Sequence, residues 1–124
     1  DLMLTGKKIP LVNENLKMRN ALKILSEKKL GVLIAVNKKN LIKGIVTDGQ
    51  IRRFNQKNLE LHSFTVKKIM TKNPIGIDKD ALAAKALSLM NNKKITSLYV
   101  YRDKNKKKVI GIIHIHNILQ SKIS

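Results

Sequence analysis

The sequence predicts an α/β fold made of two copies of one β-α-β-β-α unit, packed together with pseudo-two-fold symmetry. Three observations support this fold class. Two helical faces recur 65 residues apart, each is followed by two apolar strand-like segments, and each second strand leads through a glycine into a short helix. Because each copy has only about sixty residues, neither can bury a large core alone, so the copies are expected to pack together.

Each copy opens with an extended segment and an amphipathic helix. The extended segments are 9–12 and 74–77. Apolar residues then follow at helical spacing, as Met18, Ala21, Leu22 and Leu25 in one copy and as Ala83, Ala86, Leu87 and Met90 in the other. We expect N-caps at Asn13 or Asn15 and at Asp78 or Asp80, and helix ends at the lysine pairs 28–29 and 93–94.

The second part of each copy is a pair of strands and a short helix. The first strands are 31–36 and 96–100, the turns are 37–40 and 102–108, and the glycine-led strand–helix segments are 44–53 and 111–119. The offset between the copies grows from 65 residues in the helices to 67 at Gly44 and Gly111, so the second copy carries two extra residues around its turn, where an insertion disturbs the fold least. We therefore expect one domain over residues 1–60 and another over 61–124, with a linker near 55–65.

Charge and composition narrow the function classes. The 124 residues include 26 basic and 8 acidic side chains, a formal net charge of +18, and such a field attracts polyanions, including nucleic acid. Only four of the basic residues are arginine, aromatic residues make up 3% and tryptophan is absent. Arginine forks and stacking surfaces typical of nucleic-acid recognition are therefore scarce, and we favour a solvated lysine surface over a nucleic-acid partner.

Several kinds of chemistry are excluded outright. Without cysteine there are no disulfides, thiolate metal sites or thiol nucleophiles, which fits a reducing compartment such as the cytoplasm. The longest apolar run, 30–36, is far shorter than the about 18 residues of a membrane helix. The motifs GxxxxGK[ST], GxSxG and HExxH do not occur, and no carboxylates pair at a spacing suited to acid–base work. We expect no catalytic residues in this chain.

Taken together, the repeated motifs resemble a tandem cystathionine-β-synthase (CBS) domain pair over nearly the whole chain. In that family a glycine is followed by two hydrophobic residues, Ser or Thr, two further residues, and Asp or Asn. The copies here read Gly44-Ile-Val-Thr47-Asp-Gly-Gln50 and Gly111-Ile-Ile-His114-Ile-His-Asn117. The same segments are similar to the C-terminal CBS pair of bacterial arabinose-5-phosphate isomerases.

This resemblance implies a regulatory module whose N-terminal sugar isomerase domain lies upstream of Asp1. The enzymes it resembles interconvert ribulose 5-phosphate and arabinose 5-phosphate for synthesis of the lipopolysaccharide sugar Kdo. A homodimer is implied, together with a small-molecule effector: AMP, ATP or a nucleotide sugar such as CMP-Kdo. No other cofactor is expected.

The resemblance also implies ligand-binding residues in the glycine motifs, where the hydroxyl and the carboxylate hydrogen-bond a nucleotide. The matching positions are Gly44, Thr47 and Gln50 in the first copy and Gly111, His114 and Asn117 in the second. Gln50 and His114 depart from the family pattern, since a neutral amide binds a ribose diol less well than a carboxylate. An alternative stays open, in which Thr47 and Gln50 form a capping box and Asn117 serves the start of its own helix.

Two further groups need assignment. Arg52 and Arg53 follow the first motif, and their guanidinium forks suit a phosphate, although adjacent helical residues point in different directions and one of them is expected to face solvent. His114 and His116 alternate on a strand and could converge on a metal ion, but the sequence offers no clear third and fourth ligands. We therefore predict no metal site.

The sequence leaves three possible functions open. The first is a regulatory module that binds a nucleotide or nucleotide sugar between the repeats. The second is a purely structural oligomerisation module whose ligand positions have decayed, which the two departures from the motif favour. The third is a basic accessory module for nucleic acid, whose binding would fall steeply with salt.

Overall fold

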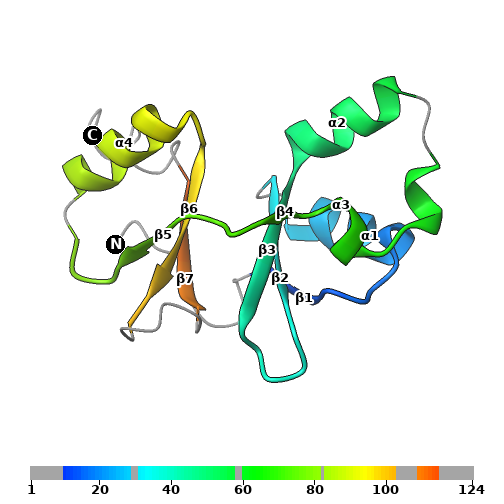
Figure 1. The fold of residues 1–124 in the computed structure, drawn as a ribbon, viewed down its shortest axis with the longest axis horizontal. Helices are drawn as coiled ribbons and strands as arrows, with labels where there is room; N and C mark the ends of the chain where they lie inside the picture. Colours follow the sequence, from blue (N-terminus) through cyan, green and yellow to red (C-terminus); the bar gives the residue numbers. More distant parts are fainter. Residues whose placement is uncertain (1–9, 29–30, 58–59, 82, 103–108, 115–124) are drawn as a thin grey trace. The chain divides into compact units, whose positions relative to one another are not determined.

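The chain folds into two compact units, and each contains the helix and the strand pair of one sequence repeat (Figure 1). The computed structural model describes residues 10–28, 31–57, 60–81, 83–102 and 109–114. The first unit is Pro10–Pro74, and the described residues from Ile75 onward belong to the second. Segment 61–74, which opens the second sequence repeat, therefore packs with the first unit.

The first unit is a four-stranded sheet with helices against one face. Its elements are β1 (Leu11–Asn13), α1 (Met18–Lys28), β2 (Val32–Val36), β3 (Ile42–Thr47), α2 (Asp48–Gln56), the 3-10 helix η2 (Leu61–Ser63), α3 (Val66–Ile69) and β4 (Thr71–Lys72). The strand order is β1-β2-β3-β4. β1 runs parallel to β2, and the other two pairings are antiparallel.

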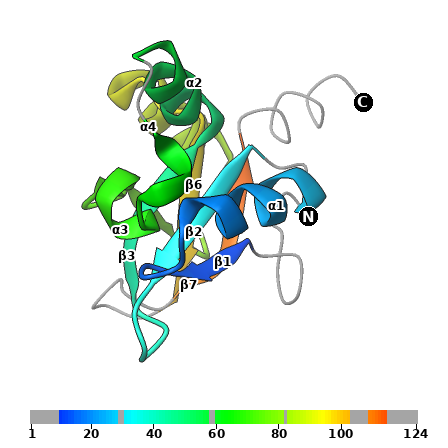
Figure 2. The ribbon, with the colours of Figure 1, turned by 90° about the vertical axis from the view of Figure 1, so that its right-hand side faces the viewer.

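The predicted helical face forms the core of this unit. Met18 and Ala21 of α1 are fully buried against Leu33, Ala35 and Val46 of the sheet, whose alternation places them on one face. Figure 2 shows α1 crossing the strands. Helix α1 ends at Lys28, as the lysine pair predicts.

The prediction of a linker near 55–65 is wrong, because this segment is part of the first unit. Helix α2 continues to Gln56, and η2 follows within the linker range. Leu61 is 3% exposed and belongs to the same core as α1. Backbone bonds from Met18 N–H to Phe64 O and from Val66 N–H to Leu16 O, each 2.8 Å, attach the segment to the loop before α1.

The second unit has the same first three elements. They are β5 (Gly76–Asp78), α4 (Ala83–Lys93) and β6 (Ser97–Tyr101). Together with β7 (Val109–His114), the strands among the described residues form a three-stranded sheet in the order β5-β6-β7. Ala86 and Met90 of α4 pack on Leu98 and Val100 of β6, which confirms the second predicted helical face. The helix predicted after His114 lies outside the described residues.

The two sheets share their strand register. Leu11 lies opposite Ile34, and Gly76 opposite Tyr99, so both parallel pairs are offset by the same 65 residues. The antiparallel pairing shifts register between Ala35 and Val36 in one sheet and between Val100 and Tyr101 in the other. The internal repeat is thus reproduced down to the position of a strand irregularity.

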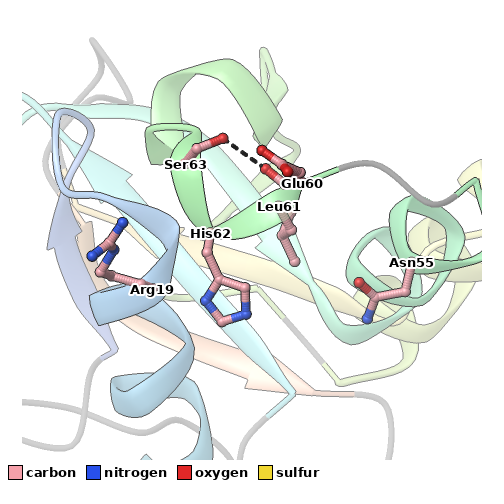
Figure 3. A pocket seen from close by; sticks show the side chains of 6 residues that line it. All are labelled: Arg19, Asn55, Glu60, Leu61, His62 and Ser63. Carbon is pink, nitrogen blue, oxygen red and sulfur yellow. Dashed lines mark hydrogen bonds between the residues drawn. The ribbon is translucent and has the colours of Figure 1, made fainter.

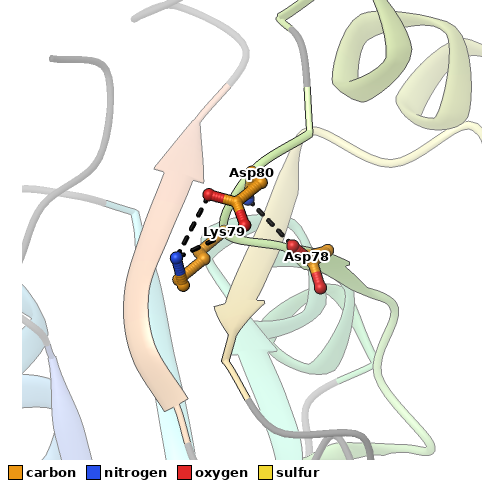
Figure 4. A network of polar contacts seen from close by, with 3 residues as sticks. All are labelled: Asp78, Lys79 and Asp80. Carbon is orange, nitrogen blue, oxygen red and sulfur yellow. Dashed lines mark hydrogen bonds and ion pairs between the residues drawn. The ribbon is translucent and has the colours of Figure 1, made fainter.

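Polar turns precede both helices at matching positions. The Oδ1 atom of Asn13 accepts the N–H of Asn15 at 2.8 Å, and Oδ1 of Asp78 accepts the N–H of Asp80 at 2.9 Å (Figure 4). Because α1 and α4 begin only at Met18 and Ala83, these side chains close Asx turns, and the prediction that they are N-caps is wrong.

No helix in the described part of the chain is both long and apolar enough to cross a membrane.

Candidate functional site

The first glycine motif forms the junction between strand β3 and helix α2. Thr47 ends β3 in an extended conformation and is the N-cap of α2. The N–H of Gln50 donates to Oγ1 of Thr47 at 3.3 Å, and Oε1 of Gln50 accepts the N–H of Thr47 at 2.8 Å. This reciprocal pair is a capping box, the alternative that the sequence left open for these two residues.

Gln50 also reaches across to strand β4. Its Nε2 donates a short hydrogen bond to Oγ1 of Thr71. The Thr47 hydroxyl donates to Oε1 of Gln50 at 3.3 Å, so the amide oxygen receives two donors. Thr71 is therefore a partner of the motif that the sequence analysis did not identify.

Gly44 permits the close approach that brings Thr71 within reach. It lies in β3 opposite Lys72 of β4. A Cβ atom at Gly44 would lie 2.5 Å from Sδ of Met70 and 2.8 Å from the backbone oxygen of Thr71. The glycine of this motif thus has a packing role in the structure, because any larger residue would push the β4 segment away.

A small surface pocket lies along one face of α2. It is lined by Gln50, Arg53, Phe54 and Lys57, which follow the helical spacing i, i+3, i+4, i+7. Two of the predicted site residues, Gln50 and Arg53, thus meet in one pocket, whereas Arg52 is not among its lining residues. Phe54 and Lys57 were missed, although counting along the helix from Gln50 identifies both.

The charged side chains of Arg53 and Asp48, near the start of α2, point in different directions. A Cβ atom at Gly49 would lie 3.5 Å from Nη1 of Arg53, so the guanidinium lies back over the first turn of α2. Oδ2 of Asp48 lies 3.0 Å from the Cβ position of Gly31, and the N–H of Asp48 donates to the Gly31 oxygen. Asp48 therefore faces the loop before β2 and does not line the pocket.

A second depression lies between α1, α2 and η2 (Figure 3). Its lining residues are Arg19, Asn55, Glu60, Leu61, His62 and Ser63. The Ser63 hydroxyl donates to the backbone oxygen of Glu60 at 2.9 Å. This depression contains no residue of either glycine motif, and we assign no ligand to it.

The second glycine motif is described only as far as its strand. Gly111 is buried in β7 opposite Val100, and His114 ends the strand opposite Ser97. Oγ of Ser97 is buried and has no hydrogen-bond partner among the described residues. The His114 side chain, His116 and Asn117 lie outside the described residues, so their predicted roles remain predictions.

The tyrosines of β6 have no counterpart in the first unit. The rings of Tyr99 and Tyr101 lie 6.0 Å apart. Burial raises the pKa of Tyr99 above its usual value of 10.0, and the neighbouring Tyr101 raises it further. Because the ring of Tyr99 covers Gly76, any side chain at that position would overlap it.

Known proteins match the chain along its whole length. The CBS domain family model matches residues 1–57 and 66–123. Arabinose 5-phosphate isomerase KdsD of Yersinia pestis is 33% identical over 98% of this chain, and KdsD of Escherichia coli K12 is 31% identical over the same share. The chain spans 36% of the length of each of these relatives.

Solved structures agree in fold. The CBS domain pair of protein MJ0100, in complex with 5′-methylthioadenosine and S-adenosyl-L-methionine, superposes with a TM-score of 0.85 at 23% identity, covering 98% of this chain and 96% of that one. CBSX2 in complex with AMP gives 0.83 at 23% identity, covering 99% and 93%. The chain belongs to the CBS domain family and is a tandem CBS pair.

Proposed function

We propose that this chain is the regulatory, non-catalytic module of a longer cytoplasmic protein of the arabinose-5-phosphate isomerase type. Its role is to bind a nucleotide or nucleotide sugar and to join two copies of the parent chain. Two findings support the proposal: the KdsD similarity at 31–33% identity, and the fact that the match spans only about a third of those enzymes. The catalytic isomerase domain is then carried by the N-terminal part of the parent.

The observation that carries the ligand part of the proposal is the pocket on α2. Gln50 of the glycine motif lines this pocket together with the two cationic residues Arg53 and Lys57 and the aromatic residue Phe54. A guanidinium can hold a phosphate or carboxylate through two parallel hydrogen bonds, and an aromatic ring offers a face for a flat base. An anionic nucleotide satisfies both groups.

Two solved CBS-domain structures support the same ligand class. One was solved with AMP and the other with 5′-methylthioadenosine and S-adenosyl-L-methionine. For a module attached to the Kdo pathway, CMP-Kdo is the effector we propose to test first, since it joins a nucleotide phosphate to a carboxylated sugar. A downstream product of this kind is suited to feedback inhibition. AMP and ATP are the other candidates.

The test compares two neighbouring arginines of α2. Arg53→Ala and Arg52→Ala each remove one positive charge from the same helix, but only Arg53 lines the pocket. Isothermal titration with CMP-Kdo, AMP and ATP at moderate salt should give an affinity for one of them that falls by about tenfold in Arg53→Ala and is unchanged in Arg52→Ala. Equal losses in both variants would mean that only the net charge attracts the ligand.

A structural module is the second candidate, and the capping box favours it. Thr47 and Gln50 already satisfy one another, so the motif has a folding role without any ligand. In that case no nucleotide binds, while the chain still sediments as a dimer. Short duplex DNA belongs in the same titration series, because binding that falls steeply with salt for DNA alone would identify a nucleic-acid module.

A further inference from the structure

We infer that Gln50 sets the ligand chemistry of the first glycine motif: it selects an unprotonated anionic oxygen, of a phosphate or carboxylate, and rejects a sugar diol. The inference rests on the proposed ligand role of this motif and deepens it. It follows from how the amide of Gln50 is bonded, from the polar groups beside it in the pocket, and from the anchoring of Thr71.

The orientation of the amide is fixed by its partners. The N–H of Thr47 can only donate, so the atom that faces it at 2.8 Å must be the oxygen, Oε1. The Thr47 hydroxyl supplies a second donor at 3.3 Å. An amide oxygen has two lone pairs, and both are occupied in the structure.

The nitrogen side of the amide is only half used. One hydrogen of Nε2 goes to Oγ1 of Thr71, and the other is left for a ligand. Thr71 cannot easily move aside, because β4 is paired with β3 and the backbone approaches Gly44 too closely for any side chain there. Gln50 therefore offers a ligand one donor and no acceptor.

A sugar diol needs the opposite chemistry. Its two adjacent hydroxyl groups each carry a proton that must find an acceptor when water is displaced. Oγ1 of Thr47 already accepts the N–H of Gln50, which leaves it one lone pair, enough for one hydroxyl but not for two. The carboxylate of Asp48 faces Gly31 and is not a lining group of the pocket.

The remaining polar groups of the pocket point to the same ligand class. Arg53 and Lys57 carry only donors, like the free hydrogen of Gln50. Three donor groups and no carboxylate suit an oxygen that bears negative charge and no proton. The phosphate or carboxylate of an effector is thus expected at this motif, while its sugar hydroxyls lie elsewhere.

The experiment separates the diol from the phosphate. The probes are AMP, 2′,3′-dideoxy-AMP and adenosine, together with the corresponding cytidine compounds, each titrated calorimetrically into the chain. For the wild type we expect the nucleotide and its dideoxy form to bind alike, and the nucleoside to bind about tenfold more weakly. A wild-type preference for the intact ribose of about tenfold or more would overturn the inference.

Substitution of Gln50 supplies the matched comparison. Gln50→Asp and Gln50→Asn have side chains of the same shape and lose the same reach towards Thr71, but only the aspartate has a second acceptor oxygen, which remains for a diol when the first accepts the N–H of Thr47. We expect Gln50→Asp to prefer AMP over dideoxy-AMP by about tenfold, and Gln50→Asn to show no such preference. Circular dichroism of both variants establishes that α2 is intact.

The outcomes distinguish this inference from the proposed function. If the wild type binds no nucleotide while Gln50→Asp gains a ribose-dependent affinity, the proposed sensing role fails and the assignment of Gln50 stands. If Gln50→Asp shows no preference for the diol, the inference is overturned, whether or not the wild type binds.

Discussion

The two units have the same backbone geometry and different side-chain chemistry. Their parallel strand pairs share one register, their antiparallel pairs share one irregularity, and their helices follow the same Asx turn. At one matched pair, however, Leu11 lies beside Ile34 in the first unit, and Gly76 beside Tyr99 in the second. Side-chain volume is thus redistributed across the pair while the strands keep their register.

The glycine motifs differ in the same way. In the first motif, Gln50 forms hydrogen bonds with both Thr47 and Thr71, and strand β4 is paired with the strand that carries the motif. The second has His114 and Asn117 at the matching positions. Both units keep the same backbone geometry, while the polar groups of their glycine motifs differ. The two copies can therefore acquire separate roles.

The largest expected effect on the free energy of unfolding comes from substitution of Gly76. Because the ring of Tyr99 covers its Cα, Gly76→Ala forces an overlap and should lower the free energy of unfolding by about 1–3 kcal/mol. Leu11→Ala, at the matched position, is a control with a smaller effect, since Leu11 is 39% exposed. Tyr99→Ile in the Gly76→Ala background should restore most of the loss in urea unfolding. No rescue would mean that the size exchange between the units is not the cause.

A second prediction uses two glycines of the first motif. Gly44→Ala places a methyl group against Met70 and the backbone of Thr71 and should cost about 1–3 kcal/mol. Gly49→Ala should instead stabilise α2 by about 0.5–1 kcal/mol, because alanine favours the helix and its Cβ would lie 3.5 Å from Nη1 of Arg53 and 3.8 Å from Oγ1 of Thr47, which are ordinary contact distances. Thermal and urea unfolding of the two variants would contradict this account if their effects had the same sign.

Removal of the capping box is expected to lower the stability by a smaller amount. Thr47→Ala removes the acceptor for the Gln50 N–H and should lower stability by about 1 kcal/mol, whereas Thr47→Ser keeps the hydroxyl and stays close to the wild type. The measurement is the urea midpoint at constant slope. An equal loss in both variants would point to the lost methyl group and away from the hydrogen bond.

The smallest expected effect is on how the free energy of unfolding depends on pH, and it comes from a tyrosine of the second unit. Since the pKa of Tyr99 is raised, the folded state holds its phenolic proton more tightly than the unfolded chain. The resulting stability is fully present below about pH 10 and is lost as pH rises through the higher folded pKa. Tyr99→Phe should therefore make the decline in unfolding free energy above pH 10 shallower than in the wild type. Parallel declines would exclude Tyr99 as the titrating group.

Much of this architecture was predictable because periodicity reports directly on burial. The spacing of Met18 and Ala21, and of Ala86 and Met90, identified the buried helical faces in both units. The polar segment near 55–65 was misjudged as a linker because Leu61, the one buried apolar residue among its described positions, carries no periodic signal. A single anchor of this kind becomes visible only in three dimensions.

The candidate site was predictable in its residues but not in its bonding. The motif identified Thr47 and Gln50, and the capping-box pattern was also readable from their spacing. The contact with Thr71 was not, because it joins residues 21 positions apart through a strand only two residues long. Long-range polar contacts of this kind depend on the tertiary fold and leave no local pattern.

The most direct test of the central claim is a nucleotide titration of the ¹⁵N-labelled chain, followed by its backbone amide signals. If the first glycine motif and the α2 pocket hold the anionic group of an effector, CMP-Kdo or AMP should shift the signals of residues 47–57 in a saturable way, and in Arg53→Ala the same shifts should need about tenfold more ligand to saturate. Saturable binding that leaves residues 47–57 unchanged would contradict the claim, and so would the absence of any saturable shift.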